Sequence, residues 1–126
     1  ETARVEGREH IECWGTGSAS REFLYVDDAA EGIVRAAEVV EEPEPINLGT
    51  NMEISIRDLV VLIAKLVGFE GEIRWDPSKP DGQPRRCLDV SRARDRLDWT
   101  AAVAFEEGLR RTIDWWREHG GEAATS

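Results

Sequence analysis

Short apolar segments alternate with helical patterns along this chain, and this alternation limits the possible fold more than any other feature. Residues 10–14 alternate as a strand does, and residues 72–75 form a second expected strand. Between them, residues 56–67 place apolar side chains at helical spacing. Strands that alternate with helices are typical of α/β proteins. We therefore predict the α/β class, with a small sheet and three to four helices.

The first expected helix follows two neighbouring aspartates. Asp27 or Asp28 is expected to cap a helix that reaches about Val40, before a proline-containing segment ends it. Neighbouring carboxylates at a helix start serve as caps far more often than as an acid/base pair. The expected inner stripe of this helix is Ala29, Ile33, Ala36, Ala37 and Val40.

The second expected helix has the clearest end signals. Ser55 followed by Asp58 resembles a capping box, although Glu or Gln is preferred at the later position. Gly68 suits a left-handed C-cap. Before this helix, residues 46–50 are expected to form a short buried strand that ends at a glycine turn.

Two more helices are expected in the last third of the chain. Ser91 is expected to cap a short helix that ends at Leu97, after an extended segment over 87–90. Another helix begins near Phe105 and should stop at Gly120-Gly121. The predicted organisation is therefore one domain over residues 1–119 and a disordered tail over residues 120–126.

Composition excludes several classes of protein. The 126 residues suit one domain, and 26 acidic against 16 basic residues give a net charge of −10. This charge argues against a nucleic-acid or anionic-membrane binder, and no apolar run approaches the ~20 residues of a membrane span. Two cysteines, Cys13 and Cys87, lack the spacing of a zinc site or a disulfide scaffold. A reducing, cytoplasmic setting is the default expectation.

The charge is unevenly distributed along the chain. Residues 74–111 hold nine basic and seven acidic side chains, whereas the rest of the chain is strongly acidic. A local basic strip on an acidic protein favours a small anionic ligand over a polyanion. The alternative is that Arg92, Arg94 and Arg96 only solvate one helix face.

Motifs for catalysis are missing from the sequence. It contains no Gly-x-Gly-x-x-Gly turn, no phosphate-binding Walker loop and no Gly-x-Ser-x-Gly elbow. The only tyrosine, Tyr25, has Ala29 four residues later, so no Tyr-x-x-x-Lys pair exists. We therefore predict no catalytic residue and leave open whether the chain is an enzyme.

Two residues near the glycine-rich turn over 15–20 are candidates for binding. Arg21 either pairs with Glu22 or Asp27 at the surface or holds phosphate oxygens. Trp14, at the end of the first expected strand, either joins the core or forms an aromatic wall of a binding site.

The loop over residues 76–86 is the most unusual stretch of the chain. Its three prolines exclude a helix, and the simplest interpretation is a stiffened turn. It also carries Asp81 beside Arg85 and Arg86. One carboxylate and two guanidiniums suit a sugar hydroxyl next to a diphosphate.

Five strings of residues follow one another in an order that resembles a known family. They are Trp14-Gly-Thr-Gly, Arg21-Glu-Phe-Leu-Tyr-Val-Asp-Asp28, Ile46-Asn-Leu-Gly-Thr50, Ser78-Lys-Pro-Asp-Gly-Gln-Pro-Arg-Arg86 and Leu88-Asp-Val90. Together they resemble the C-terminal third of the GDP-L-fucose synthases, NADPH-dependent epimerase/reductases of the extended short-chain dehydrogenase/reductase superfamily. The string that begins at Ser78 is the most specific to this branch.

The resemblance implies a substrate-binding role for four residues. Trp14, Arg21 and Asp81 match substrate-contacting residues of the family, and Arg86 stands where the family usually has lysine. Tyr25 stands where a histidine is common. These departures leave the sugar more open than the diphosphate, and the implied ligand is a GDP-sugar.

The same resemblance implies which parts of the family's machinery this chain lacks. The nicotinamide-binding glycine turn, the Ser/Tyr/Lys set and the N-terminal Rossmann part of the family have no counterpart here. The expected function is the substrate-binding portion of an NADPH-dependent GDP-sugar epimerase/reductase, without bound cofactor and inactive alone. The alternatives are a free-standing interaction or oligomerisation module that has lost the ligand, or one half of a split enzyme with a separate Rossmann chain.

Overall fold

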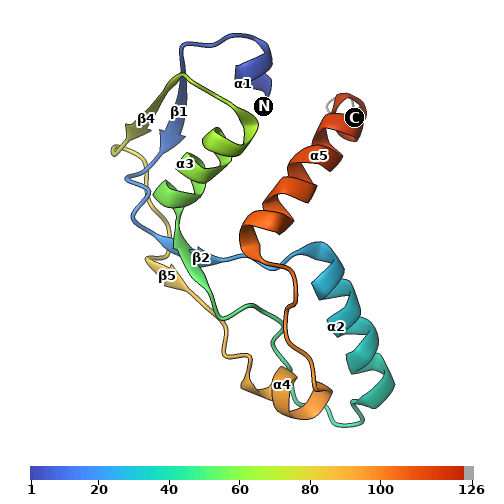
Figure 1. Cartoon of the computed structure of the whole chain (residues 1–126). Coiled ribbons are helices and arrows are strands. Elements are labelled where there is room, and N and C mark those ends of the chain that lie inside the picture. The colour runs from blue at the N-terminus through green and yellow to red at the C-terminus, as the bar shows by residue number, and fades with distance from the viewer. Residues whose placement is uncertain (124–126) are drawn as a thin grey trace. The chain divides into compact units, whose positions relative to one another are not determined.

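A computed structural model describes residues 1–123 and confirms the α/β class (Figure 1). Five helices and five strands form in this part of the chain, one helix more than the range expected. Their order is α1 (Thr2–Val5), β1 (His10–Trp14), β2 (Ser20–Glu22), α2 (Val26–Val39), β3 (Glu53–Ser55), α3 (Ile56–Val67), β4 (Glu72–Asp76), β5 (Arg85–Arg86), α4 (Ser91–Leu97) and α5 (Phe105–Ala123).

The chain divides into two compact units. The sheet unit comprises Glu1–Arg21 and Glu53–Arg86, and the helical unit comprises Glu22–Met52 and Cys87–Ser126. The sheet unit holds both small sheets with α1 and α3, whereas the helical unit holds α2, α4 and α5.

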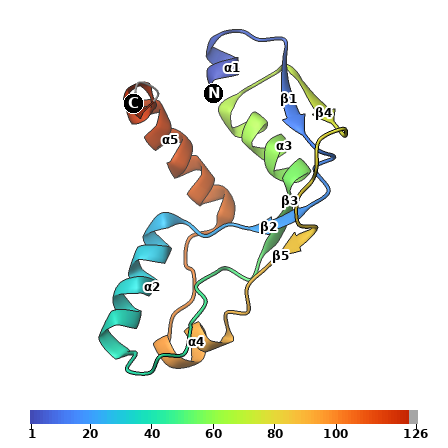
Figure 2. The same ribbon diagram turned by 180° about the vertical axis from the view of Figure 1, so that it is seen from behind.

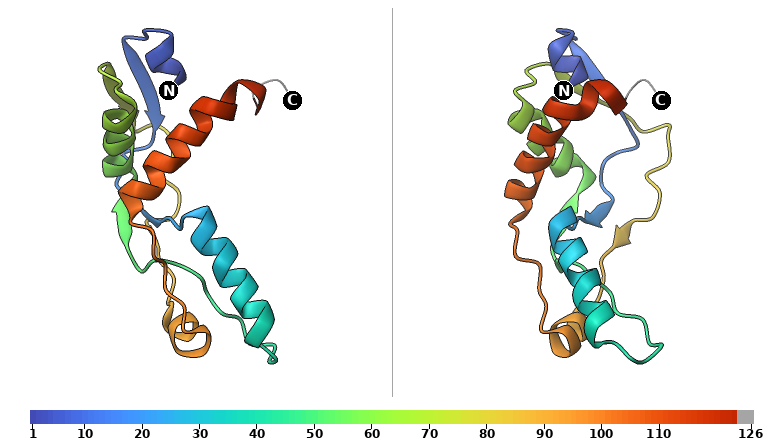
Figure 3. Two further views of the ribbon diagram at one scale, coloured as in Figure 1. Left: turned by 45° about the vertical axis from the view of Figure 1, so that its right-hand side comes forward. Right: turned by 90° about the vertical axis from the view of Figure 1, so that its right-hand side faces the viewer.

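The first sheet of the sheet unit pairs β1 with β4 in parallel. Their register runs from His10 opposite Glu72 to Trp14 opposite Asp76, and the Gly15 N–H extends it by donating to the Asp76 carbonyl at 2.9 Å. Both strands match their predicted positions. Helix α3 lies alongside this pair in every view (Figures 1, 2 and 3).

The second sheet has the strand order β3-β2-β5. Strands β2 and β5 are parallel, with Ser20 opposite Arg85 and Arg21 opposite Arg86. The Ser20 N–H donates to the Pro84 carbonyl at 2.9 Å, so the end of the proline-rich loop is held at the start of β2.

Helix α3 begins and ends as its local signals predict. The Ser55 side chain accepts a hydrogen bond from the Asp58 N–H at 3.0 Å, and its hydroxyl donates to the Asp58 carboxylate at 2.6 Å. Gly68 adopts φ +76°, a left-handed conformation in which other residues are strained. The Phe69 N–H then satisfies the Ala64 carbonyl at 2.9 Å.

The core of the helical unit is small and centred on α4. Ala93, Leu97 and Trp99 are buried, and Trp99 is 3% exposed. Partly buried side chains from α2, its flanking segments and the segment after α4 pack against these three: Leu24, Ala36, Val40, Ile46, Leu48 and Ala101.

The predicted cap of α2 is wrong. The N-cap position is Tyr25, and both aspartates lie inside the first turn with no side-chain cap of this helix. Asp28 is 4% exposed and instead accepts hydrogen bonds from the N–H groups of Ala102 at 3.2 Å and Val103 at 3.0 Å. Its carboxylate is therefore used by the segment that leads into α5.

The predicted inner stripe of α2 is only partly correct. Ala29, Ala36 and Val40 are partly buried, but Ile33 is 63% exposed and Ala37 is also exposed. The inner face is centred on Asp28 and Gly32 instead. A Cβ at Gly32 would lie 2.8 Å from a Leu48 methyl. The close approach of the segment around Leu48 therefore determines which face of α2 is buried.

Several expectations about the other segments are also wrong. Residues 46–50 form no strand, and Val90 rather than Ser91 holds the N-cap position of α4. The Asp89 carboxylate accepts the Ser91 N–H at 2.9 Å, so the carboxylate two residues earlier satisfies this orphan donor.

Helix α5 continues through Gly120-Gly121 to Ala123. The predicted stop at these glycines is therefore wrong, since a glycine in a helix costs only about 1 kcal/mol relative to alanine. The predicted tail overlaps the end of α5, and its residues 124–126 lie outside the described residues.

Candidate anion-binding site

All four predicted site residues lie in the sheet unit. Trp14 ends β1, Arg21 lies in β2, Asp81 lies in the loop between β4 and β5, and Arg86 ends β5. The strand register brings Arg21 and Arg86 directly opposite each other. Because neighbouring strands are about 4.8 Å apart, the bases of these two side chains are close.

The second sheet separates its charges between its two faces. Successive residues of a strand point to opposite faces, so Arg21 and Arg86 share one face while Ser20 and Arg85 share the other. On the latter face, Arg85 Nε donates to the Glu53 carboxylate oxygens at 2.9 and 3.0 Å, and Ser20 Oγ donates to the same carboxylate at 2.8 Å. The positive charge of Arg85 is thus compensated.

The face that carries Arg21 and Arg86 has no such compensation. Arg21 Nη1 donates to the Ser20 carbonyl at 2.6 Å, and within residues 1–123 neither guanidinium forms an ion pair. The predicted alternative, a pairing of Arg21 with Glu22 or Asp27, is therefore not found. Like charges directly opposite in paired strands are destabilising. An anion between two guanidinium forks would remove that cost.

Trp14 is a surface residue. Its side chain is 74% exposed, so it belongs to no core within residues 1–123. The Lys79 ammonium lies 5.7 Å from the centre of the Trp14 ring, within the range of a cation–π contact. Sequence reasoning did not select Lys79, although it lies two residues before Asp81 in the string that was singled out.

The Asp81 carboxylate binds the turn formed by Gly15, Thr16 and Gly17. One oxygen accepts the N–H groups of Thr16 at 2.6 Å and Gly17 at 3.2 Å, and the other accepts the Thr16 hydroxyl at 2.7 Å. The side-chain and backbone hydrogen bonds from Thr16 lower the pKa of Asp81, and the Gly17 N–H adds to this effect. Asp81 is therefore a carboxylate at neutral pH, and its oxygens face the turn.

The turn itself is held from the other side by α3 and β4. The Arg57 guanidinium donates to the Thr16 carbonyl and lies 4.7 Å from the centre of the Trp75 ring. A Cβ at Gly17 would lie 2.6 Å from Trp75, and Gly17 has φ +74°. Glycine is therefore required there by both the backbone conformation and the available space.

Glu22 of the helical unit binds several backbone N–H groups, a role that the sequence did not predict. Its carboxylate accepts the N–H groups of Thr50, Asn51 at 2.7 Å and Leu88 at 2.8 Å. Partial burial acts to raise the pKa of Glu22, but the backbone donors from Leu88, Asn51 and Thr50 outweigh it and lower the pKa. The only sequence signal was its place in the family string beside Arg21.

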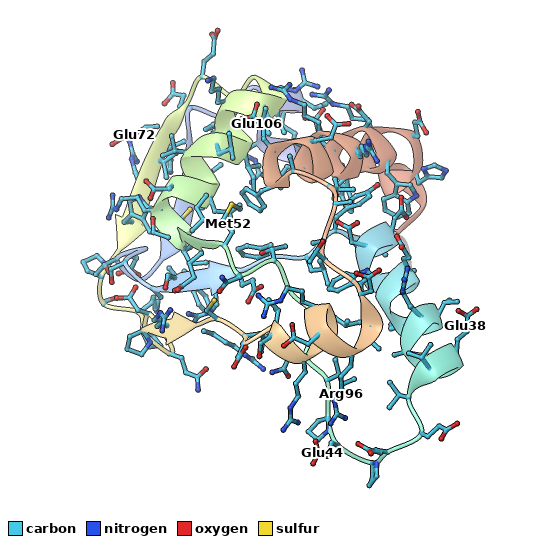
Figure 4. All side chains as sticks on the ribbon, turned by 60° about the horizontal axis from the view of Figure 1, so that its bottom comes forward. Glu38, Glu44, Met52, Glu72, Arg96 and Glu106 are labelled. Atoms are coloured by element: carbon cyan, nitrogen blue, oxygen red, sulfur yellow. The ribbon has the colours of Figure 1, made fainter. Side chains whose placement is uncertain are left out.

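The arginines of α4 are neutralised within the helical unit. Arg96 pairs with Glu44 at 3.6 Å (Figure 4) and with Glu42 at 3.0 Å, and Arg92 pairs with Glu44 at 3.5 Å. Arg94 pairs with its neighbour Asp95 at 2.8 Å. Acidic side chains therefore neutralise the part of the basic strip that lies in α4. Arg21 and Arg86, in contrast, form no ion pair in the part of the chain that the structure describes.

Two other features are absent from the described residues: a metal-binding cluster and a helix that could span a membrane. Residues 1–123 hold no group of three or more His, Cys, Asp or Glu side chains placed to bind a metal ion. In the same range, no helix has the length and apolar character needed to cross a membrane.

Comparison with known proteins identifies the class of this fold. Residues 2–49 match the model of the NAD dependent epimerase/dehydratase family. The crystal structure of a GDP-L-fucose synthetase from Naegleria fowleri bound to NADP is similar over 96% of this chain and 38% of its own, with 26% identity and a TM-score of 0.88. The predicted resemblance to the extended short-chain dehydrogenase/reductases is therefore confirmed.

In sequence, the chain is similar to the GDP-L-fucose synthases. GDP-L-fucose synthase 1 of Arabidopsis thaliana is 44% identical over 90% of this chain and 35% of its own length. GDP-L-fucose synthase of Escherichia coli K12 is 38% identical over 93% of this chain and 39% of its own length. The chain spans little more than a third of the curated relatives that it matches.

The Gly15–Gly17 turn is not free to bind the phosphates of a dinucleotide. The chain's one Gly-x-Gly turn, Gly15-Thr16-Gly17, is the only candidate for the phosphate-binding turn of such a site. Its N–H groups at Thr16 and Gly17 already bind the Asp81 carboxylate, and a Cβ at Gly15 would lie 2.3 Å from the same group. The turn is therefore occupied by the chain's own side chain.

Proposed function

We propose that this chain is the substrate-binding portion of an NADPH-dependent GDP-sugar epimerase/reductase of the GDP-L-fucose synthase type. The observation that carries the proposal is the opposed pair Arg21 and Arg86, which share one sheet face and form no ion pair within residues 1–123. Two guanidinium forks at this spacing suit the neighbouring phosphates of a nucleoside diphosphate.

The other site residues supply the surroundings of the diphosphate. The exposed Trp14 ring forms a flat wall for the nucleotide or sugar, and Lys79 adds a positive charge beside it. Asp81 lies in the loop that joins these residues to Arg86. A ribose or sugar hydroxyl could also donate a hydrogen bond directly to Asp81, at a lone pair of the carboxylate that the Gly15–Gly17 turn does not occupy.

The chemistry of hydride transfer is assigned to residues outside this sequence. The similar GDP-L-fucose synthetase from Naegleria fowleri is bound to NADP in its crystal structure. No Gly-rich nicotinamide turn and no Tyr-x-x-x-Lys pair occur in these 126 residues. We therefore propose that the chain binds substrate and does not catalyse the reaction alone. A cytoplasmic location remains a proposal, in line with the low cysteine content.

Calorimetric titration with GDP, with NADPH as the control ligand, tests this function. We expect GDP to bind, NADPH not to bind, and Arg21→Ala or Arg86→Ala to weaken GDP binding at least about tenfold, because each removes a charge-assisted contact. Millimolar affinity is expected for a partial site. Arg86→Lys restores the residue usual in the family and should keep most of the affinity.

The matched control is Arg74→Ala. Arg74 is an exposed arginine of β4 that pairs with Glu72 at 2.8 Å, and its loss should leave GDP affinity unchanged. If GDP does not bind, or if Arg74→Ala weakens binding as much as Arg21→Ala, the assignment of a diphosphate site to Arg21 and Arg86 is wrong.

A second candidate function is association with another polypeptide. Helix α2 exposes an apolar stripe that consists of Val26, Ala30, Ile33, Val34 and Ala37, with Val26 67% and Val34 58% exposed. These positions fall within about 100° of one helix face. We propose that this exposed apolar stripe packs against another polypeptide.

The charge around the stripe favours a different polypeptide over a second copy. Exposed carboxylates of Asp27, Glu31 and Glu38 line one side of it. Two copies would bring these acidic rims together, and the chain already carries a net charge of −10. The alternative of a split enzyme, with a separate Rossmann chain that has a basic rim, is therefore preferred over self-association.

A further inference from the structure

The turn between β1 and β2 has the geometry of an anion-binding nest, and Asp81 fills it. Two successive backbone N–H groups, those of Thr16 and Gly17, converge on one carboxylate oxygen. Such converging N–H groups form a concave site for an anion. Gly15, with φ +81°, leaves the space that the carboxylate occupies, since a Cβ there would lie 2.3 Å from it.

Asp81 belongs to a long loop with few other anchors. At the start of the loop, Asp76 accepts the N–H groups of Ser78, through its carboxylate at 3.0 Å, and of Lys79, through its carbonyl at 3.2 Å. At its end, the Pro84 carbonyl accepts the Ser20 N–H at 2.9 Å. Asp81 is therefore the anchor for the middle of the loop.

The middle of this loop carries groups that face the proposed diphosphate site. Lys79 lies over the Trp14 ring at 5.7 Å. A Cβ at Gly82 would lie 3.6 Å from Arg21 Nη2, so the loop backbone passes beside that guanidinium. The position of the carboxylate between Lys79 and Gly82 thus decides where both of these groups lie.

We propose that Asp81 is a positioning residue that clasps the loop over residues 77–84 to the Gly15–Gly17 nest and thereby builds the surface formed by Trp14, Lys79 and Arg21. This inference rests on the proposed function for its effect on ligand binding. It differs from a direct contact because Asp81 then acts through Thr16 and Gly17 and not through a substrate hydroxyl.

Amide hydrogen exchange measured by NMR tests the hydrogen bonds between Asp81 and the turn without any ligand. In Asp81→Asn the charge is lost, and in Asp81→Ala the acceptor is lost. We expect exchange at the Thr16 and Gly17 N–H groups to become at least about tenfold faster in the alanine variant. The control is Asp89→Asn, because Asp89 also accepts a backbone N–H, that of Ser91, but lies in the helical unit.

A double-mutant cycle on GDP affinity separates the two roles of Asp81. Thr16→Val removes the hydroxyl bond to Asp81 together with the two bonds that the hydroxyl forms with the Ser18 Oγ and N–H groups, whereas Thr16→Ser keeps all three. If Asp81 acts through the turn, Thr16→Val weakens GDP binding about threefold, Thr16→Ser restores it, and the double variant is no weaker than Asp81→Asn alone. If Asp81 contacts the ligand, Thr16→Val has no effect, and that result overturns the positioning role.

The two readouts distinguish the failure of this inference from that of the proposed function. Faster exchange at Thr16 and Gly17 in a chain that does not bind GDP supports the clasp and overturns the diphosphate site. Unchanged exchange in Asp81→Ala, together with weakened GDP binding, overturns the clasp and keeps the diphosphate site.

Discussion

Three carboxylates of this chain bind the backbone of irregular segments that are distant in sequence. Asp81 binds the turn at Thr16 and Gly17, Asp28 binds the segment before α5, and Glu22 binds two separate segments. N–H groups outside helices and strands need partners when they are shielded from water. In these segments, acidic side chains therefore supply the hydrogen-bond acceptors that a neighbouring strand would supply in a sheet.

The pH dependence of stability should reveal the role of Glu22. Its pKa is lowered in the folded chain, so its contribution is fully present above the unfolded-state pKa and is lost as the pH falls through the folded pKa. We expect Glu22→Gln to be less stable than the wild type at pH 7, and this difference to shrink as the pH falls below about 4. Urea unfolding from pH 3 to 7 measures it.

A control substitution at Glu12 isolates the contribution of Glu22 to the pH dependence of stability. Asp81 and Asp89 also have lowered pKa values and add to the acid sensitivity of the whole chain. The difference between Glu22→Gln and the wild type cancels their contribution. The exposed Glu12 of β1 provides the matched control, and an equal loss of stability in Glu12→Gln at pH 7 would contradict the role given to Glu22.

At the scale of elements, α3 and α2 differ in what determines them. Helix α3 has a side-chain cap at Ser55, a left-handed glycine at Gly68 and an apolar stripe, all of which are local. Helix α2 has no side-chain cap, and its buried face is selected by the approach of Leu48 to Gly32. Local signals are therefore sufficient for the first helix and insufficient for the second.

The cap of α3 should make a measurable contribution to stability. Ser55→Ala removes the acceptor for the Asp58 N–H and the donor to the Asp58 carboxylate. We expect the free energy of unfolding to fall by about 1 kcal/mol, the usual loss for such a cap. Urea titration measures it, with Ser78→Ala in the proline-rich loop as the control. An unchanged midpoint for Ser55→Ala would contradict the capping role.

At the scale of the whole molecule, the chain spans little more than a third of its relatives and exposes an apolar stripe on α2. We expect co-expression with the part of the Arabidopsis relative that this chain does not match to give a complex that co-purifies. Ile33→Lys should abolish the complex because it places a charge in the stripe. Val61→Lys is the control, since Val61 is 53% exposed but lies on α3.

Sedimentation of the chain alone completes this test. We expect a monomer across the accessible range of concentration, because the acidic rims oppose pairing of two copies. A dimer that Ile33→Lys dissociates would favour self-association through the stripe and overturn the preference for a separate Rossmann chain. A complex that survives Ile33→Lys would remove the stripe from the interface.

The candidate site was predictable to the extent that it depends on motifs. Trp14, Arg21 and Arg86 were selected from their strings, and the structure brings the two arginines together across β2 and β5. The exposed surface of Trp14 and the contact of Lys79 with it were not predictable, because both depend on the path of the loop. The role of Asp81 in the turn also depends on a contact between segments 64 residues apart or more.

The sequence by itself determined the α/β class, strands β1 and β4, both ends of α3 and the relation to the GDP-L-fucose synthases, because period, caps and motifs are local information. Only the tertiary structure decided which face of α2 is buried, that residues 46–50 form no strand, and where Asp28 and Asp81 direct their carboxylates. These outcomes depend on which segments meet, and a strand or a buried carboxylate requires a partner that its own neighbours in sequence cannot supply.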